Sequence, residues 1–330
     1  MQKVKIMSIN SKLQTPLVSV IIPTFNRPSY LKKAIESAIR QTYRNIEIIV
    51  SDNCSPENPQ ALVESFQDPR IRFSRNPTNL GMFANTRNAF KKARGKYAAS
   101  LLDDDMWEED FLEKLVPPLE AAPDLVLAFC DHYVINAENE IDSALTEHCS
   151  QLFNRADLKE GIYQPFCELS LVQGAVSSAT AAVLRLDVVN WDSIPPEVGG
   201  SWDMYLNYLY CRSGLGAYYY PAKLTRVRVH EQSETMLSGK RDVEAKIRKA
   251  KAEVFCYEHF MKDDRLQKLR PYFQQKWVHV NTTLGIGLMR AKQREEARSY
   301  FWRALRQRFN LRTTAALMLS FTPPQMAARF

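Results

Sequence analysis

The sequence of 330 residues lacks an uninterrupted apolar run long enough to cross a membrane, since a spanning helix needs about 20 such residues. Its 11 glycines and 17 prolines are too few for a collagen or a low-complexity chain. Residues 1–15 contain lysines but no apolar block after them, so we expect no signal peptide. With 45% hydrophobic and 25% charged residues, the composition is typical of a globular protein with a full core.

No C-x-x-C pair occurs among the six cysteines, which are Cys54, Cys130, Cys149, Cys167, Cys211 and Cys256. In a chain of this length, such scattered spacing favours reduced thiols over a disulfide framework or a zinc site. No G-x-G-x-x-G motif follows any predicted strand, which argues against a dinucleotide-binding Rossmann domain. These absences predict a cytoplasmic protein without structural metal clusters of the thiolate type.

The net charge of +7 is unevenly distributed along the chain. Residues 1–239 hold 24 basic and 29 acidic side chains, a net charge of −5, whereas residues 240–330 hold 20 basic and 8 acidic ones, a net charge of +12. A stretch this basic suits an anionic membrane surface or nucleic-acid phosphates. It also suits a solvated helical face, and charge alone does not separate these interpretations.

Strands and helices are predicted to alternate through the first 130 residues. Near-continuous β-branched and apolar runs predict buried strands at 17–22, 46–50, 97–102 and 125–130. Helices are expected at 28–39, 62–66 and 108–119, and a short strand at 71–73. A further helix is expected from 79 to about 94, ended by Gly95. Such alternation predicts an open α/β sheet, whose ligands bind at the carboxyl ends of its strands.

The second half of the chain gives a weaker pattern. Strands are expected at 177–184, 218–220 and 224–229, with a helix at 202–211. From about residue 240 onward the pattern is helical, and small residues between 284 and 304 have the spacing of one tetratricopeptide-like hairpin. One such repeat cannot form a solenoid, so we expect a packed helical cap.

Three contiguous aspartates, Asp103, Asp104 and Asp105, follow the predicted strand at 97–102. Three adjacent like charges cost free energy unless a cation neutralises them. Mg²⁺ and Mn²⁺ take carboxylate oxygens and leave positions for substrate phosphates. The alternative is a solvated acidic turn that caps the next helix.

Other candidate site residues lie at the ends of predicted strands or at the start of a predicted helix. Asp52 can accept hydrogen bonds from a base or a ribose, or it can cap a helix. Asp203 lies near the start of a predicted helix, as a general base or as a first-turn acid favoured by the helix dipole. His230 follows a strand next to Arg228, where an anion site is one interpretation and a purely structural histidine the other.

Taken together, these segments resemble glycosyltransferase family 2, the inverting enzymes of the GT-A fold. The resemblance covers residues 16–235, and its segments occur in the family's order. They are 18–27, the strand that ends at Asp52, 79–81, 87–88, 93–97, 103–105, 202–203 and 228–230. It implies an open, mostly parallel sheet flanked by helices, followed by a C-terminal helical extension. The implied domains are an N-terminal extension at 1–15, a catalytic domain at 16–238 (donor half 16–132, acceptor half 133–238) and a basic helical region at 239–330.

The resemblance also implies roles for individual residues. Asp203 would be the base that deprotonates the acceptor hydroxyl, and Asp105, Asp104 and His230 would hold a divalent Mn²⁺ or Mg²⁺ ion. The residues implied to bind the nucleotide-sugar are Pro23, Thr24, Phe25, Asn26, Arg27, Asp52, Asn79, Gly81, Arg87, Asp103 and Asp104. The implied reaction moves one sugar with inversion from a UDP-, GDP- or dTDP-sugar to an acceptor hydroxyl.

The sequence departs from the family pattern at several positions. The acid motif often has a spacer between its aspartates, so the register of the contiguous triplet is open. The residue after Asp52 is often acidic but here is Asn53, and Asp203 is often preceded by Glu but here follows Trp202. Segment 273–277 only approximates the Gln-x-x-Arg-Trp motif of processive members, so we expect transfer of a single sugar.

The resemblance implies a glycan or lipid-linked acceptor, such as a surface-polysaccharide or glycolipid precursor. We therefore expect a cytoplasmic protein that can lie peripherally on the membrane, with segment 294–321 facing anionic lipid. Nucleic acid is a less favoured partner, because Tyr300, Phe301 and Trp302 also fit a buried helix face. Two alternatives remain. One is a nucleotide-sugar-binding protein without turnover. The other is a nucleotidyltransferase, which would need a glycine-rich phosphate loop with a Lys or Arg near the first strand, and only Arg27 is present there.

Overall fold

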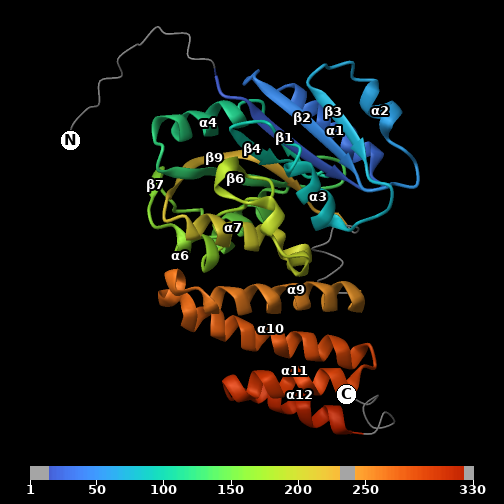
Figure 1. Ribbon diagram of the computed structural model, residues 1–330, viewed down its shortest axis with the longest axis vertical. Coiled ribbons are helices and arrows are strands. Elements are labelled where there is room, and N and C mark those ends of the chain that lie inside the picture. Colours follow the sequence, from blue (N-terminus) through green and yellow to red (C-terminus); the bar gives the residue numbers. More distant parts are fainter. Residues whose placement is uncertain (1–14, 231–241, 323–330) are drawn as a thin grey trace, which may run out of the picture.

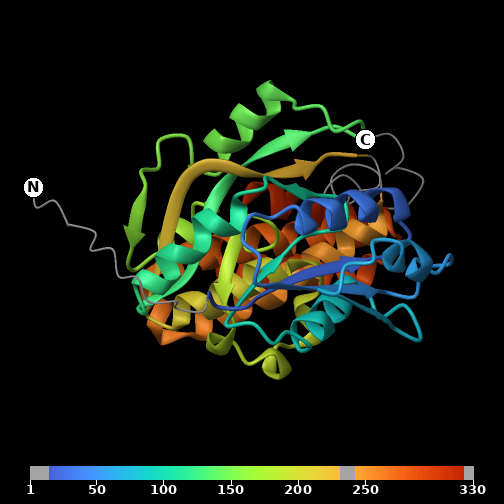
Figure 2. The same cartoon turned by 90° about the horizontal axis from the view of Figure 1, so that it is seen from above.

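The computed structural model of the protein describes residues 15–230 and 242–322. Residues 1–14 of the predicted N-terminal extension and the predicted boundary at 238–239 lie outside the described residues. A mixed sheet forms one layer, and a stack of long helices lies beneath it (Figure 1). Seen from above, the helices run underneath the sheet and its flanking helices (Figure 2).

The sheet has the strand order β3-β2-β1-β4-β8-β6-β9-β5, and β7 pairs with β9 outside this path. Strands β3, β2, β1 and β4 are mutually parallel, β8 is antiparallel to β4 and β6, and β6 is parallel to β9. The strands are β1 (Val18–Thr24), β2 (Ile46–Asp52), β3 (Ile71–Arg75), β4 (Tyr97–Ser100), β5 (Met106–Trp107), β6 (Leu125–Ile135), β7 (Gly161–Tyr163), β8 (Ala182–Arg185) and β9 (Gly216–Arg228).

Helices flank the sheet and then form a cap. The helices that flank the sheet are α1 (Pro28–Ile39), α2 (Gln60–Glu64), α3 (Met82–Phe90), α4 (Phe111–Ala121), α5 (Ser143–Leu152), α6 (Cys167–Leu171) and α7 (Trp202–Arg212), with 3₁₀ turns η1 (Leu186–Val188), η2 (Trp191–Ser193) and η3 (Pro196–Ser201). The cap consists of α9 (Val243–Lys262), η5 (Asp264–Leu269), α10 (Arg270–Arg290), α11 (Arg294–Gln307) and α12 (Leu311–Phe321).

The predicted α/β alternation is confirmed, and its cause is visible in the burial of the first elements. Every residue of β1 and β2 is buried, as expected for parallel strands covered by helices on both faces. Helix α1 starts at Pro28, which suits a first-turn position. It packs Leu31, Ala34, Ile35 and Ala38 into the core, and full burial of one such leucine or isoleucine contributes about 1.5–3 kcal/mol.

Three local predictions were wrong. Helix α3 ends at Phe90 rather than near residue 94, so Gly95 does not end it. Gly95 is needed for another reason, since a Cβ there would lie 2.5–2.8 Å from backbone atoms of residues 17, 19 and 97. The strand predicted at 177–184 begins only at Ala182.

The third correction concerns β9, which is one strand where two were predicted. Its partner register shifts from Cys130 opposite Tyr220 to Asp131 opposite Lys223. Pro221 lies in the skipped stretch and has no N–H to donate, so the strand bulges there instead of ending.

The predicted packed helical cap is confirmed. Helix α9 contacts α7 through Tyr208, whose ring stacks on Phe260 with centroids 4.5 Å apart and whose hydroxyl donates to Asp263 at 3.0 Å. Helices α10 and α11 form the predicted hairpin, in which Gly285 lies against the buried ring of Phe301. Within the described ranges, no helix is both long and apolar enough to cross a bilayer.

The Gly285 contact predicts a packing-sensitive position. A methyl group at Gly285 would come within 2.8 Å of three Phe301 ring carbons, whereas one at Gly287 would lie 3.1 Å from its nearest neighbour, Ile247. Both substitutions by alanine gain the same helix propensity, about 1 kcal/mol. We expect Gly285→Ala to be less stable than Gly287→Ala by about 1–3 kcal/mol because of overpacking, as measured by urea denaturation. Equal stabilities would show that the two helices separate at little cost.

Candidate functional site

The three aspartates lie in the turn that joins β4 to β5, at the carboxyl end of the parallel strands. Leu101, directly after β4, continues the ladder, and its N–H donates to the Ile21 carbonyl at 2.8 Å. Asp103, Asp104 and Asp105 are all at least 92% buried. The acidic turn is therefore an interior feature rather than a solvated cap.

Asp103 is held by the end of β1. One carboxylate oxygen, Oδ2, accepts from the Thr24 hydroxyl at 2.7 Å and from the Phe25 N–H at 3.3 Å. The other, Oδ1, lies 3.2 Å from an Arg27 guanidinium nitrogen. These contacts join the segment after β1 to the acidic turn.

Asp104 lies between two basic side chains, one from the segment after β1 and one from the segment after β9. Its Oδ2 lies 2.7 Å from Arg27 Nη1 and 3.0 Å from His230 Nε2. The Tyr30 ring, on α1, lies 5.1 Å from the His230 ring and 4.8 Å from the Arg228 guanidinium. Segments near residues 27, 104 and 230 are thus brought together.

Asp105 is fixed by the end of β9. Its Oδ1 accepts from the Arg228 N–H at 2.9 Å. The Arg228 guanidinium donates to the Asp104 carbonyl at 2.8 Å, to the Asn136 carbonyl at 2.6 Å and to Asn139 Oδ1 at 2.7 Å. Arg228 therefore holds the acidic turn in place. The sequence indicated only that Arg228 lies near His230, not this structural role.

Electrostatics in the turn favour a bound cation. Burial, reinforced by the charge of Asp104 and opposed by that of Arg27, raises the pKa of Asp103 to about 6. Burial, again reinforced by Asp104, raises the pKa of Asp105 well above its ordinary value. Arg27 and His230 thus leave part of the buried negative charge uncompensated.

The residues present fit a divalent ion that is completed by a ligand. Within residues 15–230 and 242–322, no three carboxylate, imidazole or thiolate groups converge on one point. Mg²⁺ is commonly held by one or two carboxylates together with water and substrate phosphates. Buried carboxylates with raised pKa values suit that arrangement better than an all-protein cage.

Asp52 lies at the end of β2, and no helix starts there, so the cap interpretation is wrong. Its fully buried carboxylate pairs with Arg75 Nη1 at 2.7 Å and accepts from the Ser55 N–H and hydroxyl. Ser55 Oγ also accepts from the Asn26 N–H at 2.8 Å. Arg75 was missed, although its position opposite Asp52 in the parallel register follows from strand alignment.

Asn53 organises the loop before α3. Its amide donates to Asn79 Oδ1 at 2.8 Å, and its own Oδ1 accepts from the Leu80 N–H at 2.9 Å. Asn79 Oδ1 also accepts from the N–H of Gly81, which has a φ of 82°. Asn53 thus shapes the loop that carries two of the predicted donor-binding residues.

Arg87 lies apart from the acidic turn. It projects from α3 over the Phe83 ring, and its guanidinium donates to the Ile194 carbonyl at 3.3 Å. These contacts place Arg87 beside the segment between η2 and η3 and do not join it to Asp103–Asp105.

Asp203 lies in the first turn of α7, where its carboxylate accepts from the Met204 N–H at 2.8 Å. The Asp203 carbonyl accepts from the Ser178 hydroxyl at 3.2 Å. In the same segment, the Thr180 carbonyl accepts from the indole N–H of Trp107, two residues after Asp105. Segment 178–180 thus connects Asp203 to the acidic turn.

Helix α9 supplies charged neighbours to Asp203. Burial raises the pKa of Asp203, and Lys249 opposes the shift. Burial also raises the pKa of Glu253. The charge of Lys249 lowers that pKa, and the charge of Asp203 raises it. Glu253 was not found from the sequence, because nothing in the pattern of α9 says which helix face meets α7.

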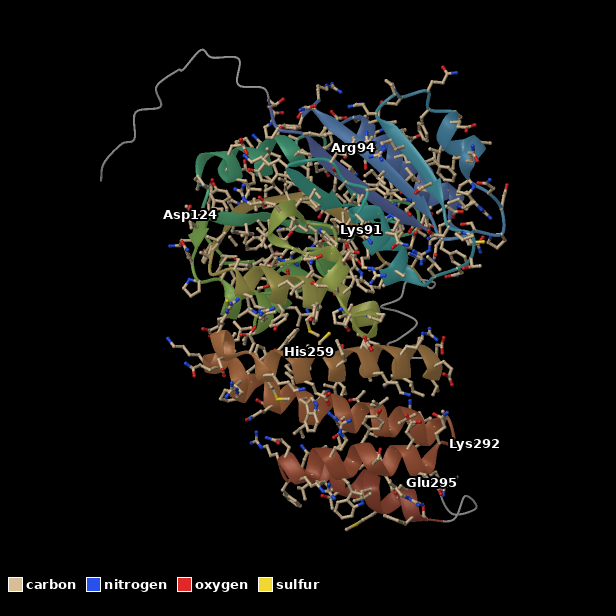
Figure 3. The ribbon with its side chains drawn as sticks, in the orientation of Figure 1. Lys91, Arg94, Asp124, His259, Lys292 and Glu295 are labelled. Carbon is tan, nitrogen blue, oxygen red and sulfur yellow. The ribbon has the colours of Figure 1, made fainter. Side chains whose placement is uncertain are left out.

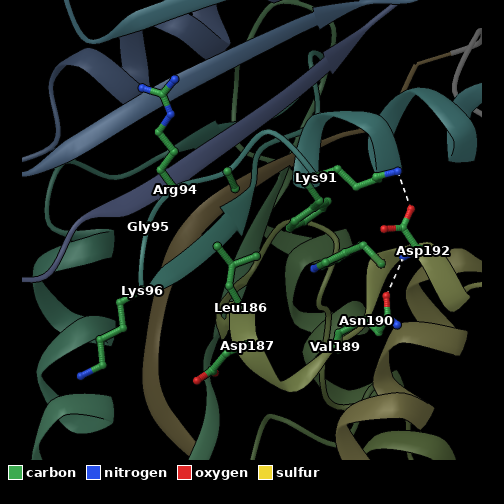
Figure 4. Close-up of a pocket in the computed structure, with 12 residues that line it drawn as sticks. Lys91, Arg94, Gly95, Lys96, Leu186, Asp187, Val189, Asn190 and Asp192 are labelled. Atoms are coloured by element: carbon green, nitrogen blue, oxygen red, sulfur yellow. Dashed lines mark hydrogen bonds and ion pairs between the residues drawn. The ribbon is translucent and has the colours of Figure 1, made fainter.

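A shallow cleft of 470 Å³ lies elsewhere, at the amino end of β4. Figure 4 shows Lys91 paired with Asp192 on its rim and Leu186 and Val189 along its wall. In the wider view, Lys91 and Arg94 lie on the sheet-bearing half, away from the helical cap (Figure 3). This cleft contains none of the predicted site residues.

Known proteins share sequence and fold with this chain. The glycosyl transferase family 2 pattern matches residues 19–166, which include the acidic turn. Residues 19–166 therefore match a family 2 glycosyltransferase domain. The chain is 34% identical over 125 residues, 37% of this chain and 45% of the relative, to the putative colanic acid biosynthesis glycosyl transferase WcaA of Escherichia coli K12. It is 36% identical over 97 residues, 29% of this chain and 38% of the relative, to the E. coli UDP-Glc:alpha-D-GlcNAc-diphosphoundecaprenol beta-1,3-glucosyltransferase WfgD.

Solved structures extend the likeness over almost the whole chain. Staphylococcus aureus TarS 1–349, crystallised with UDP-GlcNAc, covers 94% of this chain and 87% of its own, with a TM-score of 0.65 and 15% identity. The Pyrobaculum calidifontis mannosyltransferase PcManGT, solved with GDP-Man and Mn²⁺, covers 96% and 84%, with a TM-score of 0.57 and 16% identity. The predicted GT-A fold is confirmed. The sequence matches to the two E. coli relatives span less than half of each relative's length.

The buried charge of Asp105 predicts a stability difference. A carboxyl whose pKa is raised by folding makes the folded state less stable as pH rises above the ordinary value of about 4. Asp105→Asn removes that charge but keeps an oxygen for the Arg228 N–H. With EDTA present, we expect the variant to melt at a higher temperature than the wild type at pH 7.5 and at a similar temperature at pH 4.

The control for this experiment is Asp124→Asn, which removes an exposed carboxylate and should leave both melting temperatures within about 1 °C of wild type. A wild-type protein more stable than Asp105→Asn at pH 7.5 would contradict the uncompensated charge. It would mean that Arg27 and His230 already balance the acidic turn.

Proposed function

We propose that this protein is an inverting glycosyltransferase that moves one sugar from a nucleotide-sugar to an acceptor hydroxyl. The observation that carries the proposal is the buried acidic turn held between the end of β1 and the end of β9. Negative charge there suits a cation that faces a diphosphate, and the family 2 match supplies the reaction class.

The donor would lie along the carboxyl ends of β1, β2 and β4. We assign its nucleotide to segment 23–27, to Asp52 and to the loop with Asn79 and Gly81, and we keep Asp103 and Asp104 on the sugar or ribose side. UDP-GlcNAc and GDP-Man, named with the two structural neighbours, support a nucleotide-sugar donor. Among UDP-, GDP- and dTDP-sugars we make no choice.

Asp105 and Asp104, together with His230, which lies 3.0 Å from Asp104 Oδ2, would hold a Mn²⁺ or Mg²⁺ ion against the diphosphate, whose oxygens would complete the site. When bound, such an ion stabilises the negative charge of the departing nucleoside diphosphate. Arg27, 2.7 Å from Asp104, adds positive charge on the same side. Arg228 keeps Asp105 in position by its backbone N–H.

Asp203 would take the proton from the acceptor hydroxyl as it attacks the sugar. Its raised pKa makes it a better base than an ordinary carboxylate once it is ionised. Attack from the face opposite the leaving group inverts the anomeric centre without a covalent intermediate, so one separate carboxylate is sufficient. The acceptor would be a cell-surface polysaccharide or a lipid-linked glycan, as the names of WcaA and WfgD suggest. Such acceptors fit a protein on the cytoplasmic side of the membrane.

A donor-hydrolysis screen tests the proposal. The purified protein is incubated with UDP-, GDP- and dTDP-sugars and Mn²⁺, and released nucleotide is measured, with and without undecaprenyl-diphosphate glycans. We expect release from one donor, reduced about 10²-fold or more in Asp105→Ala, because the metal contributes several kcal/mol. Asp203→Asn should keep donor binding and lose about 10²–10⁴-fold in transfer.

The two alternatives predict other results in the same screen. A binding protein without turnover would bind one donor and release nothing with any acceptor. A nucleotidyltransferase would instead form nucleotide-sugar and pyrophosphate from a sugar phosphate and a nucleoside triphosphate. Either result would overturn the glycosyl-transfer proposal.

The pH dependence of transfer tests the role of Asp203. Because its pKa is raised, kcat/KM should rise with pH through an apparent pKa above the ordinary value of about 4. Lys249→Met removes a positive charge and should shift this limb to higher pH, whereas Glu253→Gln should shift it to lower pH. Arg248→Met, an exposed change on the same helix, is the matched control. If neither Lys249→Met nor Glu253→Gln shifts the apparent pKa of the kcat/KM profile, Asp203 is not the general base.

A further inference from the structure

The outer end of the helical cap exposes an unusual amount of apolar surface. Six large apolar side chains between residues 302 and 321 are 44–76% exposed. We call them the outer apolar patch: Trp302, Phe309, Leu311, Met318, Leu319 and Phe321. Exposed apolar side chains gathered in one short segment in this way indicate an interaction site.

The outer apolar patch is organised by α12. Thr313, Leu317 and Ser320 face the cap and are buried, while Leu311, Ala315 and Met318 recur on the opposite, exposed face. This helix forms the layer farthest from the sheet (Figure 1). The patch therefore has no described element of the chain covering it.

The segment of the chain that carries the outer apolar patch has charges of one sign. Residues 297–322 contain five arginines and no acidic residue. Arg306, Arg308 and Arg312 are exposed, and none of them has an ion-pair partner among the described residues. The nearest acids in the chain, Glu295 and Glu296, belong to the first turn of α11, where Figure 3 labels Glu295 beside the α10–α11 turn.

Three other arginines of segment 294–321 serve the cap itself. Arg294 donates to the Thr322 carbonyl at 2.5 Å, and Arg298 donates to the Ser320 carbonyl at 2.8 Å. Arg303 pairs with Glu258 of α9. They tie α12 to the cap, so only the three exposed arginines are left for a partner.

We propose that α12 and the turn before it dock on the surface of an anionic lipid bilayer, with the outer apolar patch entering the interface and Arg306, Arg308 and Arg312 at the headgroups. Exposed aliphatic and aromatic side chains on one helix face, with basic residues around them, are the pattern of interfacial helices. The docking goes beyond the proposed sugar transfer and does not require it.

Charge and chemistry favour lipid over two other occupants. A second copy of the chain would bring the same three arginines face to face, which like-charge repulsion opposes. Nucleic acid would satisfy the arginines but would leave Leu311, Met318 and Leu319 without apolar contacts. An anionic bilayer satisfies both the charge and the apolar surface.

Vesicle sedimentation of the full chain tests the proposal. We expect the protein to pellet with phosphatidylglycerol–phosphatidylcholine vesicles at 50 mM salt and to pellet much less with pure phosphatidylcholine or at 500 mM salt. The double variant Arg308→Glu/Arg312→Glu removes basic residues that each contribute about 1 kcal/mol near the surface. Leu311→Asn/Met318→Asn removes apolar groups that contribute about 0.8 kcal/mol per buried CH₂. Each double variant should therefore bind at least about tenfold more weakly. Both pairs are exposed, so circular dichroism should show an unchanged fold.

Matched controls lie on the other half of the molecule. Leu152→Asn on α5 and Lys114→Glu on α4 also change exposed residues and should leave vesicle binding unchanged. Hydrolysis of a soluble donor should be unaffected in every variant, which separates this proposal from the proposed transfer.

Three results would overturn the docking proposal. The first is that both double variants pellet as much as the wild type, and the second is that the wild type does not pellet with anionic vesicles at 50 mM salt. The third is that light scattering shows self-association of the wild type that Leu311→Asn/Met318→Asn abolishes. The last result would assign the outer apolar patch to a second copy.

Discussion

Three carboxylates in one buried turn are the constraint on which the rest of the site depends. Burial costs each ionised group solvation, and adjacency adds like-charge repulsion, so the turn needs positive charge from elsewhere. Arg27 arrives from the loop after β1, and His230 and the Arg228 N–H from the end of β9. Residues 27, 104 and 228–230 are far apart in the chain, and the sheet brings them together around this turn.

The same constraint connects the site to the fold. Parallel strands β1, β2 and β4 end at one edge, which places Thr24, Asp52 and Asp103 near one another. The bulge at Pro221 lets β9 continue alongside β6 as far as Arg228, which lies opposite Ile135, and His230 follows two residues later. The helical cap then meets the domain at α7, so charged residues of α9 influence Asp203.

Much of this was predictable from the sequence, and the failures have physical causes. Continuous apolar runs predicted β1, β2 and β4, and the acidic residues at strand ends followed directly. Gly95 was misread because a close backbone approach leaves the same signal as a helix terminus. Arg75 and Glu253 were missed because strand register and helix-face orientation depend on packing, which no local pattern encodes. Arg294, Arg298 and Arg303 look like surface charge in the sequence, yet they bind the cap.

The central claim is that the acidic turn binds a divalent ion together with a nucleoside diphosphate. Calorimetric titration of UDP, GDP and dTDP into the protein, with Mn²⁺ and with EDTA, tests it most directly when the wild type is compared with Asp105→Asn. We predict that one nucleotide binds at least about tenfold more tightly with Mn²⁺, a gain of about 1.4 kcal/mol, and that Asp105→Asn loses this gain. Equal affinity in Mn²⁺ and EDTA, or an unchanged gain in Asp105→Asn, would contradict the account.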